Sequence, residues 1–173
     1  ASTVGDLGKL EEAVSYYDKL LALNSCNSDA LLGKGFALSN LSRYDEAISC
    51  YTTLLNSEPE NLEALKSRAL ALSKSNKSDD ALADYDKIIK LQPENSQILV
   101  EQASLLEALG RYQESAACYG RILKISPGNR EIIFKQGKAL ENSGDLEGAV
   151  GCYDRILALD PGNVDAYNNK GFA

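Results

Sequence analysis

Apolar residues recur along the chain with the spacing of an amphipathic helix. Within residues 28–61, Leu31, Gly35 and Leu38 follow one another at i, i+4 and i+7, which places them on one face of a predicted helix. A short polar interruption comes next. A second stripe of the same kind follows at Ala47, Ile48, Tyr51, Leu54 and Leu55. This stretch therefore predicts two helices joined by a tight turn.

The predicted helix pair repeats every 34 residues. Five tyrosines, five asparagines and all four prolines of the chain keep this period: Tyr17, Tyr51, Tyr85, Tyr119 and Tyr153; Asn27, Asn61, Asn95, Asn129 and Asn163; Pro59, Pro93, Pro127 and Pro161. A fixed period of this length indicates a stacked repeat array. Each pair has an apolar face that it cannot bury alone, so successive pairs are expected to stack in an all-α solenoid.

Turn and cap residues recur at matching places. Pro59 cannot continue a helix interior and biases Glu58 away from helical geometry. Asn61 then stands where the next helix needs an N-cap acceptor. An acidic or amide residue follows each such asparagine by two places, where the helix dipole favours negative charge: Asp29, Glu63, Gln97, Glu131 and Asp165. The sequence therefore predicts that a new helix begins directly after each periodic asparagine.

Small residues mark two positions of every repeat, where neighbouring helices are expected to come closest. The first predicted helix carries Gly35, Ala69, Ala103, Gly137 and Gly171, and the second carries Ala13, Ala47, Ala81, Ser115 and Ala149. A larger side chain at either position would separate the backbones at a cost of about 1–3 kcal/mol.

These features together strongly resemble the tetratricopeptide repeat (TPR) family. The family pattern of large apolar, glycine, large apolar, alanine, aromatic and proline positions is met by Leu31, Gly35, Leu38, Ala47, Tyr51 and Pro59. The three following periods keep it in register, with Ala69 and Ala103 at the glycine position and Ser115 at the alanine position. The resemblance implies a right-handed α–α superhelix of antiparallel helix pairs. The chain departs from the family where a leucine is replaced by Lys34, Arg68, Gln102, Gln136 and Lys170. We interpret this departure as altered internal packing.

The period divides residues 1–173 into a single array without a linker. We expect a partial first repeat at 1–27, full repeats at 28–61, 62–95, 96–129 and 130–163, and a half helix at 164–173. Within the partial repeat, Ser2–Leu7 is expected to be the tail of one helix, and a second helix is expected from about Glu11 to Asn24. Either the ends fray, or one molecule joins the next head to tail through Val164, Tyr167 and Phe172 at one end and Val4 and Leu7 at the other.

In the family that the chain resembles, the first helix of each pair lines a concave groove that binds a peptide or helix. Mapping by repeat position gives candidate groove residues: Leu32, Phe36, Lys66, Leu70, Val100, Glu101, Phe134, Lys135 and Lys138. Aromatic residues on an otherwise polar stripe suit a binding hot spot, which favours Phe134 and Phe172. As the alternative, Lys135 and Lys138 pair with Glu131 and Glu141 at helical spacing. The family's carboxylate clamp and asparagine ladder are not matched.

Charge limits the classes of partner. The chain has 18 basic and 25 acidic residues, a formal net charge of −7. An acidic chain without a basic stripe is poorly suited to nucleic acid or to an anionic membrane, but it suits a protein or peptide partner of basic or mixed charge. No apolar run is long enough to span a bilayer, and no signal peptide is evident, so the expected setting is cytoplasmic. The first residue, Ala1, suggests that the chain was cut from a longer protein or processed.

Catalytic and metal-binding chemistry is not indicated. The chain has no histidine, which excludes histidine-based triads and argues against a zinc site. Equivalent positions of stacked helices lie roughly 10 Å apart, whereas a disulfide needs Cα atoms within about 7 Å. Cys50, Cys118 and Cys152 share one repeat position and are expected to be buried, reduced side chains. The sequence predicts a non-enzymatic scaffold without a cofactor, or a segment that tethers or regulates an enzyme elsewhere in a longer chain.

Overall fold

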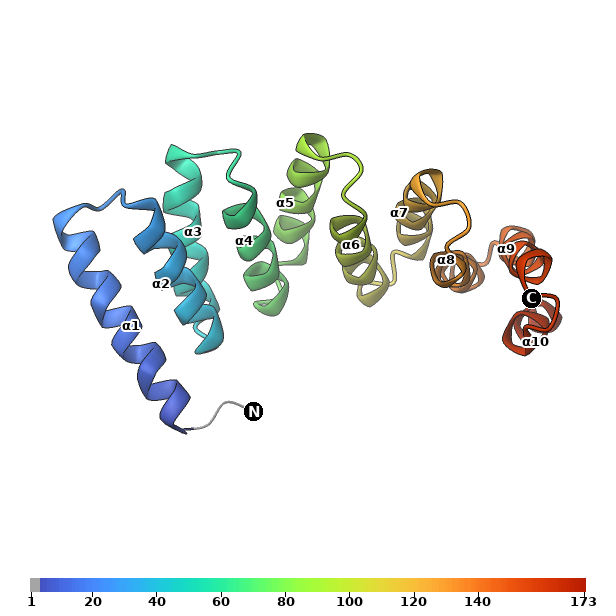
Figure 1. Ribbon diagram of the computed structural model, residues 1–173, viewed down its shortest axis with the longest axis horizontal. Coiled ribbons are helices and arrows are strands. Elements are labelled where there is room, and N and C mark those ends of the chain that lie inside the picture. Colours follow the sequence, from blue (N-terminus) through green and yellow to red (C-terminus); the bar gives the residue numbers. More distant parts are fainter. Residues whose placement is uncertain (1–3) are drawn as a thin grey trace. The chain divides into compact units, whose positions relative to one another are not determined.

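The structure is a computed structural model that describes residues 4–173, with side chains from residue 7 onward, and this part of the chain is helical without a strand (Figure 1). The predicted all-α fold of short helix pairs is confirmed. The helices are α1 (Val4–Leu23), α2 (Ser28–Asn40), α3 (Tyr44–Ser57), α4 (Leu62–Lys74), α5 (Ser78–Leu91), α6 (Ser96–Ala108), α7 (Tyr112–Ile125), α8 (Arg130–Ser143), α9 (Leu146–Leu159) and α10 (Val164–Phe172).

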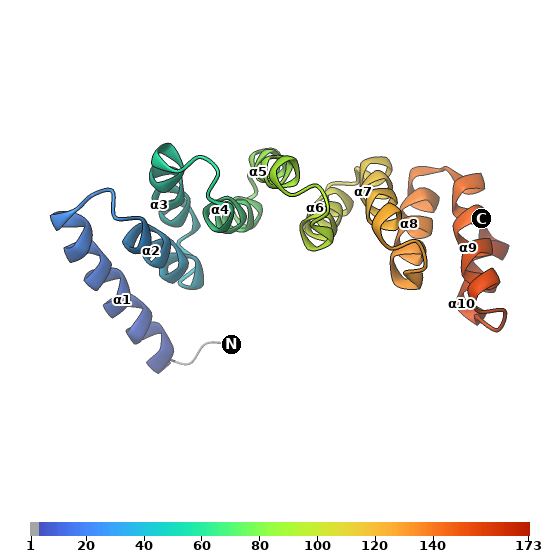
Figure 2. The same ribbon diagram turned by 45° about the horizontal axis from the view of Figure 1, so that its top comes forward.

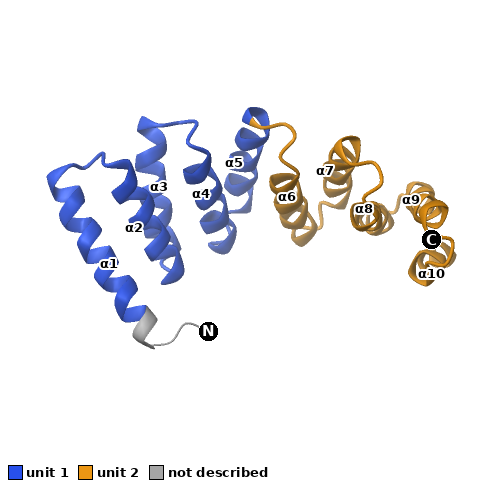
Figure 3. Cartoon of the chain, in the orientation of Figure 1, with its two compact units in different colours: residues 1–91 blue, residues 92–173 orange. Residues whose placement is uncertain are grey.

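The chain divides into two compact units, residues 1–91 and residues 92–173 (Figure 3). Unit 1 holds α1–α5 and unit 2 holds α6–α10. Inside each unit, every helix packs against the helix that follows it, and two views show this arrangement (Figures 1 and 2). We call α2, α4, α6, α8 and α10 the first helices and the others the second helices. In unit 1 the first helices α2 and α4 also contact each other.

The periodic asparagines cap the first helices, as the sequence predicts. The side-chain oxygen of Asn61 accepts a hydrogen bond from the Ala64 N–H at 3.0 Å. Asn27, Asn95, Asn129 and Asn163 make the same contact with the third residue of their helices, at 2.9–3.2 Å. Each bond satisfies one of the backbone donors that a helix leaves unpaired at its start.

A left-handed residue makes the turn between the two helices of each pair. Ser42, Asn76, Gly110 and Gly144 occupy the same repeat position with φ of 60°, 61°, 71° and 84°. The residue that follows each one bonds back to the helix end, for example Arg43 N–H to the Leu38 carbonyl at 2.9 Å. This 6→1 bond belongs to the Schellman motif, which favours a glycine or asparagine in the left-handed position.

The expected break near the start of the chain is wrong. Gly8 occupies the repeat position of the left-handed turn residues, yet α1 runs without interruption from Val4 to Leu23. Glycine permits the left-handed conformation without requiring it. Around Gly8 an added Cβ would meet nothing within 4 Å, so no close contact enforces a turn there.

The periodic tyrosines fill the space between helices. Tyr51 and Tyr119 are 1% exposed, and Tyr85 is 2% exposed. The ring of Tyr51 lies so close to the backbone of Gly35 that an added Cβ would meet its Cε1 at 2.5 Å. Tyr153 approaches Gly137 in the same way, at 2.9 Å. The predicted close approach is therefore confirmed at Gly35 and Gly137, because an aromatic ring of the second helix rests on a small residue of the first. At Gly171 an added Cβ would meet nothing within 4 Å, so the prediction is wrong there.

The three periodic cysteines are buried, as predicted, while Cys26 is exposed. Burial raises the pKa of the Cys50 and Cys152 thiols, although the nearby Lys34 ammonium opposes the shift at Cys50. Among the described residues, no helix is both long and apolar enough to cross a membrane.

Candidate functional site

The first-helix face of unit 1 carries a hollow of about 280 Å³ that contains two of the predicted binding residues, Phe36 and Leu70. We call it the Phe36 hollow. Phe36 is 64% exposed and Leu70 is 45% exposed, so two large apolar side chains are accessible side by side. The lining consists of Phe36, Ser39, Asn40, Tyr44, Tyr51, Ser67, Leu70, Ala71 and Lys74.

The repeat places these side chains together. Phe36 and Asn40 lie one helical turn apart on α2, and Leu70 and Lys74 occupy the same two repeat positions on α4. Because residues four apart share a helix face, both pairs face the hollow. The Asn40 Nδ2 donates a hydrogen bond to the Phe36 carbonyl at 2.8 Å, which leaves its Oδ1 at the rim as an acceptor.

The floor of the Phe36 hollow is formed by hydroxyl groups. Burial raises the pKa of the Tyr51 phenol, and the hydroxyls of Ser39 and Ser67 oppose that shift. The Ser39 Oγ is itself buried, and within the described chain it has no hydrogen bond of ordinary geometry. The hollow therefore combines apolar walls with a small polar floor.

Phe134 occupies a second hollow, on unit 2, of about 340 Å³. Its ring packs against Tyr153 with ring centroids 5.9 Å apart, and the side chain is half-buried. The lining residues are Arg130, Glu131, Phe134, Ile156, Asn163 and Asp165. This hollow therefore has charges of both signs, and its aromatic residue is less accessible than Phe36.

The lysines beside Phe134 are engaged within the chain. Lys135 pairs with Glu131 at 2.9 Å and Lys138 pairs with Glu141 at 3.1 Å, the pairing that helical spacing suggests. Lys138 also donates to the Asn169 Oδ1 at 3.3 Å. Burial disfavours ionisation of Glu141, but hydrogen bonds from Tyr153 and Lys138 outweigh it and lower the pKa of this carboxyl.

The remaining predicted groove residues do not line either hollow. Leu32, Lys66 and Val100 are half-buried. Glu101 is also half-buried and accepts a hydrogen bond from the Gln97 Nε2 at 3.1 Å. Their role in binding stays a prediction.

The residues predicted for self-association lie on α10 and α1. Val164, Tyr167 and Phe172 are 67%, 57% and 88% exposed on α10, and Leu7 is 39% exposed on α1. The side chain of Val4 lies outside the described residues. The contact that these residues would make with a second molecule stays a prediction.

A buried ion pair between α4 and α5 was not foreseen from the sequence. Arg68 donates to both carboxylate oxygens of Asp84 at 2.7 Å, and its Nη1 donates to the Thr52 Oγ1 at 3.1 Å. Asp84 is 2% exposed and the Arg68 side chain 16% exposed. The pair lies in a hollow of about 270 Å³ among α3, α4 and α5.

Polar partners also occupy the equivalent position of the other repeats. Lys34 pairs with Asp18 and Lys170 with Asp154, each at 2.6 Å. In unit 2, the thiols of Cys118 and Cys152 contact the side-chain oxygens of Gln102 and Gln136 at 3.4 and 3.5 Å. The interpretation of these residues as altered packing is therefore incomplete. In the sequence, these pairs could have been predicted from the residue 16 places further on, which is Asp after Arg68 and Cys after both glutamines.

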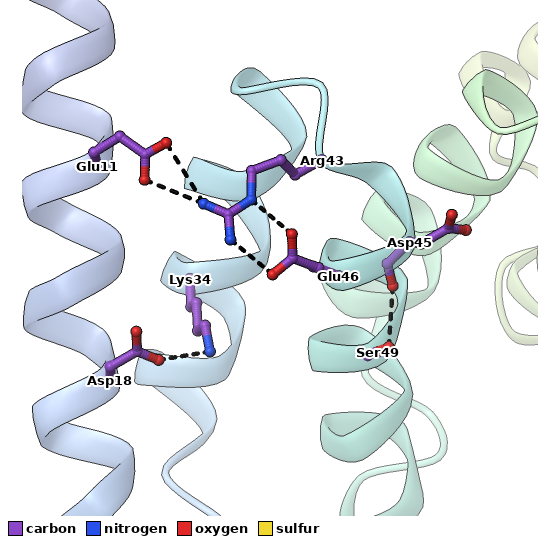
Figure 4. A network of polar contacts seen from close by, with 7 residues as sticks. All are labelled: Glu11, Asp18, Lys34, Arg43, Asp45, Glu46 and Ser49. Carbon is purple, nitrogen blue, oxygen red and sulfur yellow. Dashed lines mark hydrogen bonds and ion pairs between the residues drawn. The ribbon is translucent and has the colours of Figure 1, made fainter.

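Exposed ion pairs join the second helices of unit 1 (Figure 4). Arg43, in the turn before α3, contacts Glu11 of α1 at 3.1 Å and Glu46 of α3 at 2.6 Å. Lys77 repeats the first of these contacts one period later, with Asp45 at 2.8 Å. Exposed pairs contribute about 0–1 kcal/mol each, so we read this network as a minor support of the stack.

Neither a metal site nor a membrane-spanning helix adds another candidate site. In residues 4–173 no group of three or more potential metal-ligating side chains is close enough to hold an ion. The Phe36 hollow is therefore the strongest candidate site, since it joins exposed apolar surface to unengaged polar atoms.

Comparisons with known proteins agree with this architecture. Three family models described as tetratricopeptide repeat match residues 6–71, 66–130 and 130–163. No curated protein sequence matches. Among solved structures, MamA is 18% identical, with 100% of this chain and 99% of that chain covered and a TM-score of 0.74.

Two further solved structures show the same fold. YrrB, described as a TPR protein with an unusual peptide-binding site, is 21% identical over 97% of this chain and 87% of its own, with a TM-score of 0.72. A tetratricopeptide repeat protein from Parabacteroides merdae ATCC 43184 is 18% identical over 95% of this chain and 66% of its own, with a TM-score of 0.73. With its periodic helix pairs, capped turns and matching family models, this chain belongs to the tetratricopeptide repeat family.

Proposed function

We propose that the chain is a non-catalytic protein-interaction scaffold that binds a peptide or helix of a partner protein on its first-helix face. The observation that carries this proposal is the Phe36 hollow, where a 64% exposed phenylalanine lies beside a 45% exposed leucine. Soluble surfaces do expose single apolar residues, but two adjacent ones around a concavity are typical of a binding site.

The energy available from this site is sufficient for an anchor. An aromatic side chain can bury about 150–250 Å², so covering the exposed part of Phe36 removes roughly 100–160 Å² from water. At about 25 cal/mol/Å² this contributes about 3 kcal/mol. The helices that hold Phe36 and Leu70 are packed and capped before a partner arrives, which limits the ordering cost of binding.

A peptide-binding role is also consistent with the family. YrrB, which shares the fold, is described as having an unusual peptide-binding site. At 21% identity this likeness supports the class of ligand and not its sequence, so the ligand must be sought by experiment.

An array of short synthetic peptides tests the proposal. Peptides that bind the chain are measured by fluorescence polarisation against the wild type and Phe36→Ser. Loss of an anchor of about 3 kcal/mol weakens binding by about two orders of magnitude. Leu23→Ser is the matched control, because Leu23 is 87% exposed on α1 and outside the hollow. Equal effects of the two substitutions, or no peptide that binds, would refute the proposal.

Self-assembly is a second candidate function. The observation that favours it is the nine-residue helix α10, on which Val164, Tyr167 and Phe172 are all exposed. Sedimentation velocity over a wide range of concentration tests it, with Phe172→Glu as the disrupting variant. A wild-type chain that stays monomeric at the highest concentration excludes this candidate.

A further inference from the structure

The Phe36 hollow has a charge opposite to that of the chain as a whole. The net charge is −7, which by itself favours a basic partner. The nine lining residues nevertheless include one cation, Lys74, and no acidic side chain. The charge that a bound peptide meets at this site is therefore positive.

Lys74 is available to a partner. It lies in the last turn of α4 and is exposed. Within residues 4–173, no ion pair engages it, whereas Lys34, Lys77 and Lys135 are each paired with a carboxylate. A carboxylate that binds at the edge of the hollow therefore does not have to break an internal ion pair of Lys74 before it contacts the ammonium.

The nearest acidic groups do not cancel this charge. Glu63 begins α4, eleven residues before Lys74, which is about 16 Å along the helix axis. That separation is twice the screening length of about 8 Å at physiological salt. Asp45 and Glu46 follow the lining residue Tyr44 but are paired with Lys77 and Arg43, and Figure 4 shows the second of these pairs. Glu63 does act on the Tyr51 phenol of the lining, so the positive charge is confined to the part of the rim that Lys74 forms.

The size of the hollow limits what can enter it. Its volume of about 280 Å³ lies just below the range of about 300–1,000 Å³ that is typical of small-molecule sites. The walls are Phe36, Leu70 and Ala71. One large apolar side chain of a peptide suits this space and these walls better than a compact cofactor does.

We infer that the partner of the Phe36 hollow is an acidic peptide segment in which a large apolar side chain stands next to a carboxylate. The apolar side chain packs between Phe36 and Leu70, and the carboxylate contacts the Lys74 ammonium at the rim. The Asn40 Oδ1 accepts a hydrogen bond from the peptide backbone. This inference rests on the proposed function and gives the ligand a charge opposite to the one that the net charge favours.

Three labelled peptides provide the test. They share one Gly/Ser background and contain a single leucine followed by Glu, Gln or Lys. Fluorescence polarisation at physiological ionic strength measures their affinity for the full chain. Because an exposed pair contributes about 0.2–1 kcal/mol, the Leu-Glu peptide is expected to bind about 1.4- to 5-fold more tightly than the Leu-Gln peptide. The Leu-Lys peptide is expected to bind most weakly.

Two charge variants locate the effect. Lys74→Glu is expected to reverse the order of the Glu and Lys peptides. Lys90→Glu makes the same change in net charge on α5, outside the hollow, and is expected to leave the order unchanged. Phe36→Ser is expected to weaken all three peptides together, and circular dichroism confirms that each variant is folded.

The outcomes separate this inference from the proposed function. A wild-type preference for the Lys peptide, no preference, or an equal effect of Lys90→Glu overturns the acidic ligand. Binding that still depends on Phe36 would then leave the peptide-binding function in place. Failure of the Leu-Glu peptide to bind at all also overturns the inference, and a peptide array without any Phe36-dependent ligand overturns the function as well.

Discussion

The buried ion pair of Arg68 and Asp84 gives the sharpest test of how the repeats are held together. Replacing Arg68 with Gln removes two hydrogen bonds of 2.7 Å. The Asp84 carboxylate, 2% exposed, then keeps only the longer ion pair with Lys87 at 3.9 Å. Breaking a buried pair from one side costs about 3–5 kcal/mol. Protonating an isolated aspartate at pH 7 costs about 4 kcal/mol, which sets an upper bound near that value. We therefore expect a loss of about 3–4 kcal/mol in the free energy of unfolding.

The chain supplies its own matched control. In unit 2 the same two positions hold Gln102 with Cys118, and Gln136 with Cys152, joined by thiol contacts of 3.4 and 3.5 Å. The double variant R68Q/D84C copies this arrangement into unit 1. Because it removes the carboxylate together with its cation, it is expected to lie within about 1 kcal/mol of the wild type.

Urea unfolding followed by circular dichroism measures both effects. With a slope of about 1–3 kcal/mol/M, the single variant should lower the midpoint by at least about 1 M, and the double variant should restore most of it. A single variant as stable as the wild type would show that solvent reaches Asp84 and that burial does not govern the pair. A double variant as unstable as the single one would refute the equivalence of the two pair types.

Three further changes test the packing, the caps and the buried phenols. Gly35→Ala places a Cβ against the Tyr51 ring and should lower the free energy of unfolding by about 1–3 kcal/mol. The control Gly151→Ala, whose Cβ would meet nothing within 4 Å, should be neutral or stabilising. Equal losses of stability in the two variants would contradict the ring contact. Asn61→Ala removes a cap hydrogen bond and should lower the free energy of unfolding, measured by thermal denaturation, by about 1 kcal/mol. An unchanged stability would show that water replaces the cap. Burial raises the pKa of the Tyr119 phenol to about 12, so the unfolded chain releases this proton first, at about pH 10. The stability from this group should therefore be complete below pH 10 and lost as pH rises through 12, and ultraviolet titration that shows every tyrosine ionising near 10 would disprove it.

The repeat architecture could be predicted because it depends on local chemistry that the sequence displays directly. Asn61 after Pro59 marks a helix start whatever surrounds it, and the ring of Tyr51 needs a small partner such as Gly35. The turn at Ser42 and Asn76 was harder to predict. A left-handed residue is expected to be glycine or, less often, asparagine, and the serine at position 42 gives no such signal.

The polar pairs and the Phe36 hollow depend on which side chains meet across helices. Arg68 stands where the family has leucine, and this position alone does not explain it. Its partner Asp84 is 16 residues away in sequence, and their contact becomes evident only in the structure. Asn40 and Lys74 lie one helical turn after Phe36 and Leu70, the two residues that the repeat position predicts for the first-helix face. Their importance follows from what else lines the hollow, and above all from the absence of acids there.

The polar pairs differ in whether both partners lie within one 34-residue period. This difference limits how the repeats of such a chain can be rearranged. Arg68 with Asp84, and Gln102 with Cys118, lie inside one 34-residue period, so a segment exchanged at its Pro-to-Asn turns carries both members along. Lys34 depends on Asp18, and Lys170 on Asp154, across a period boundary. Recombination that moves residues 28–61 alone would leave Lys34 without its carboxylate. Residues 62–95 can be duplicated or relocated with the buried Arg68–Asp84 pair intact, and they would lose only the exposed contact of Lys77 with Asp45.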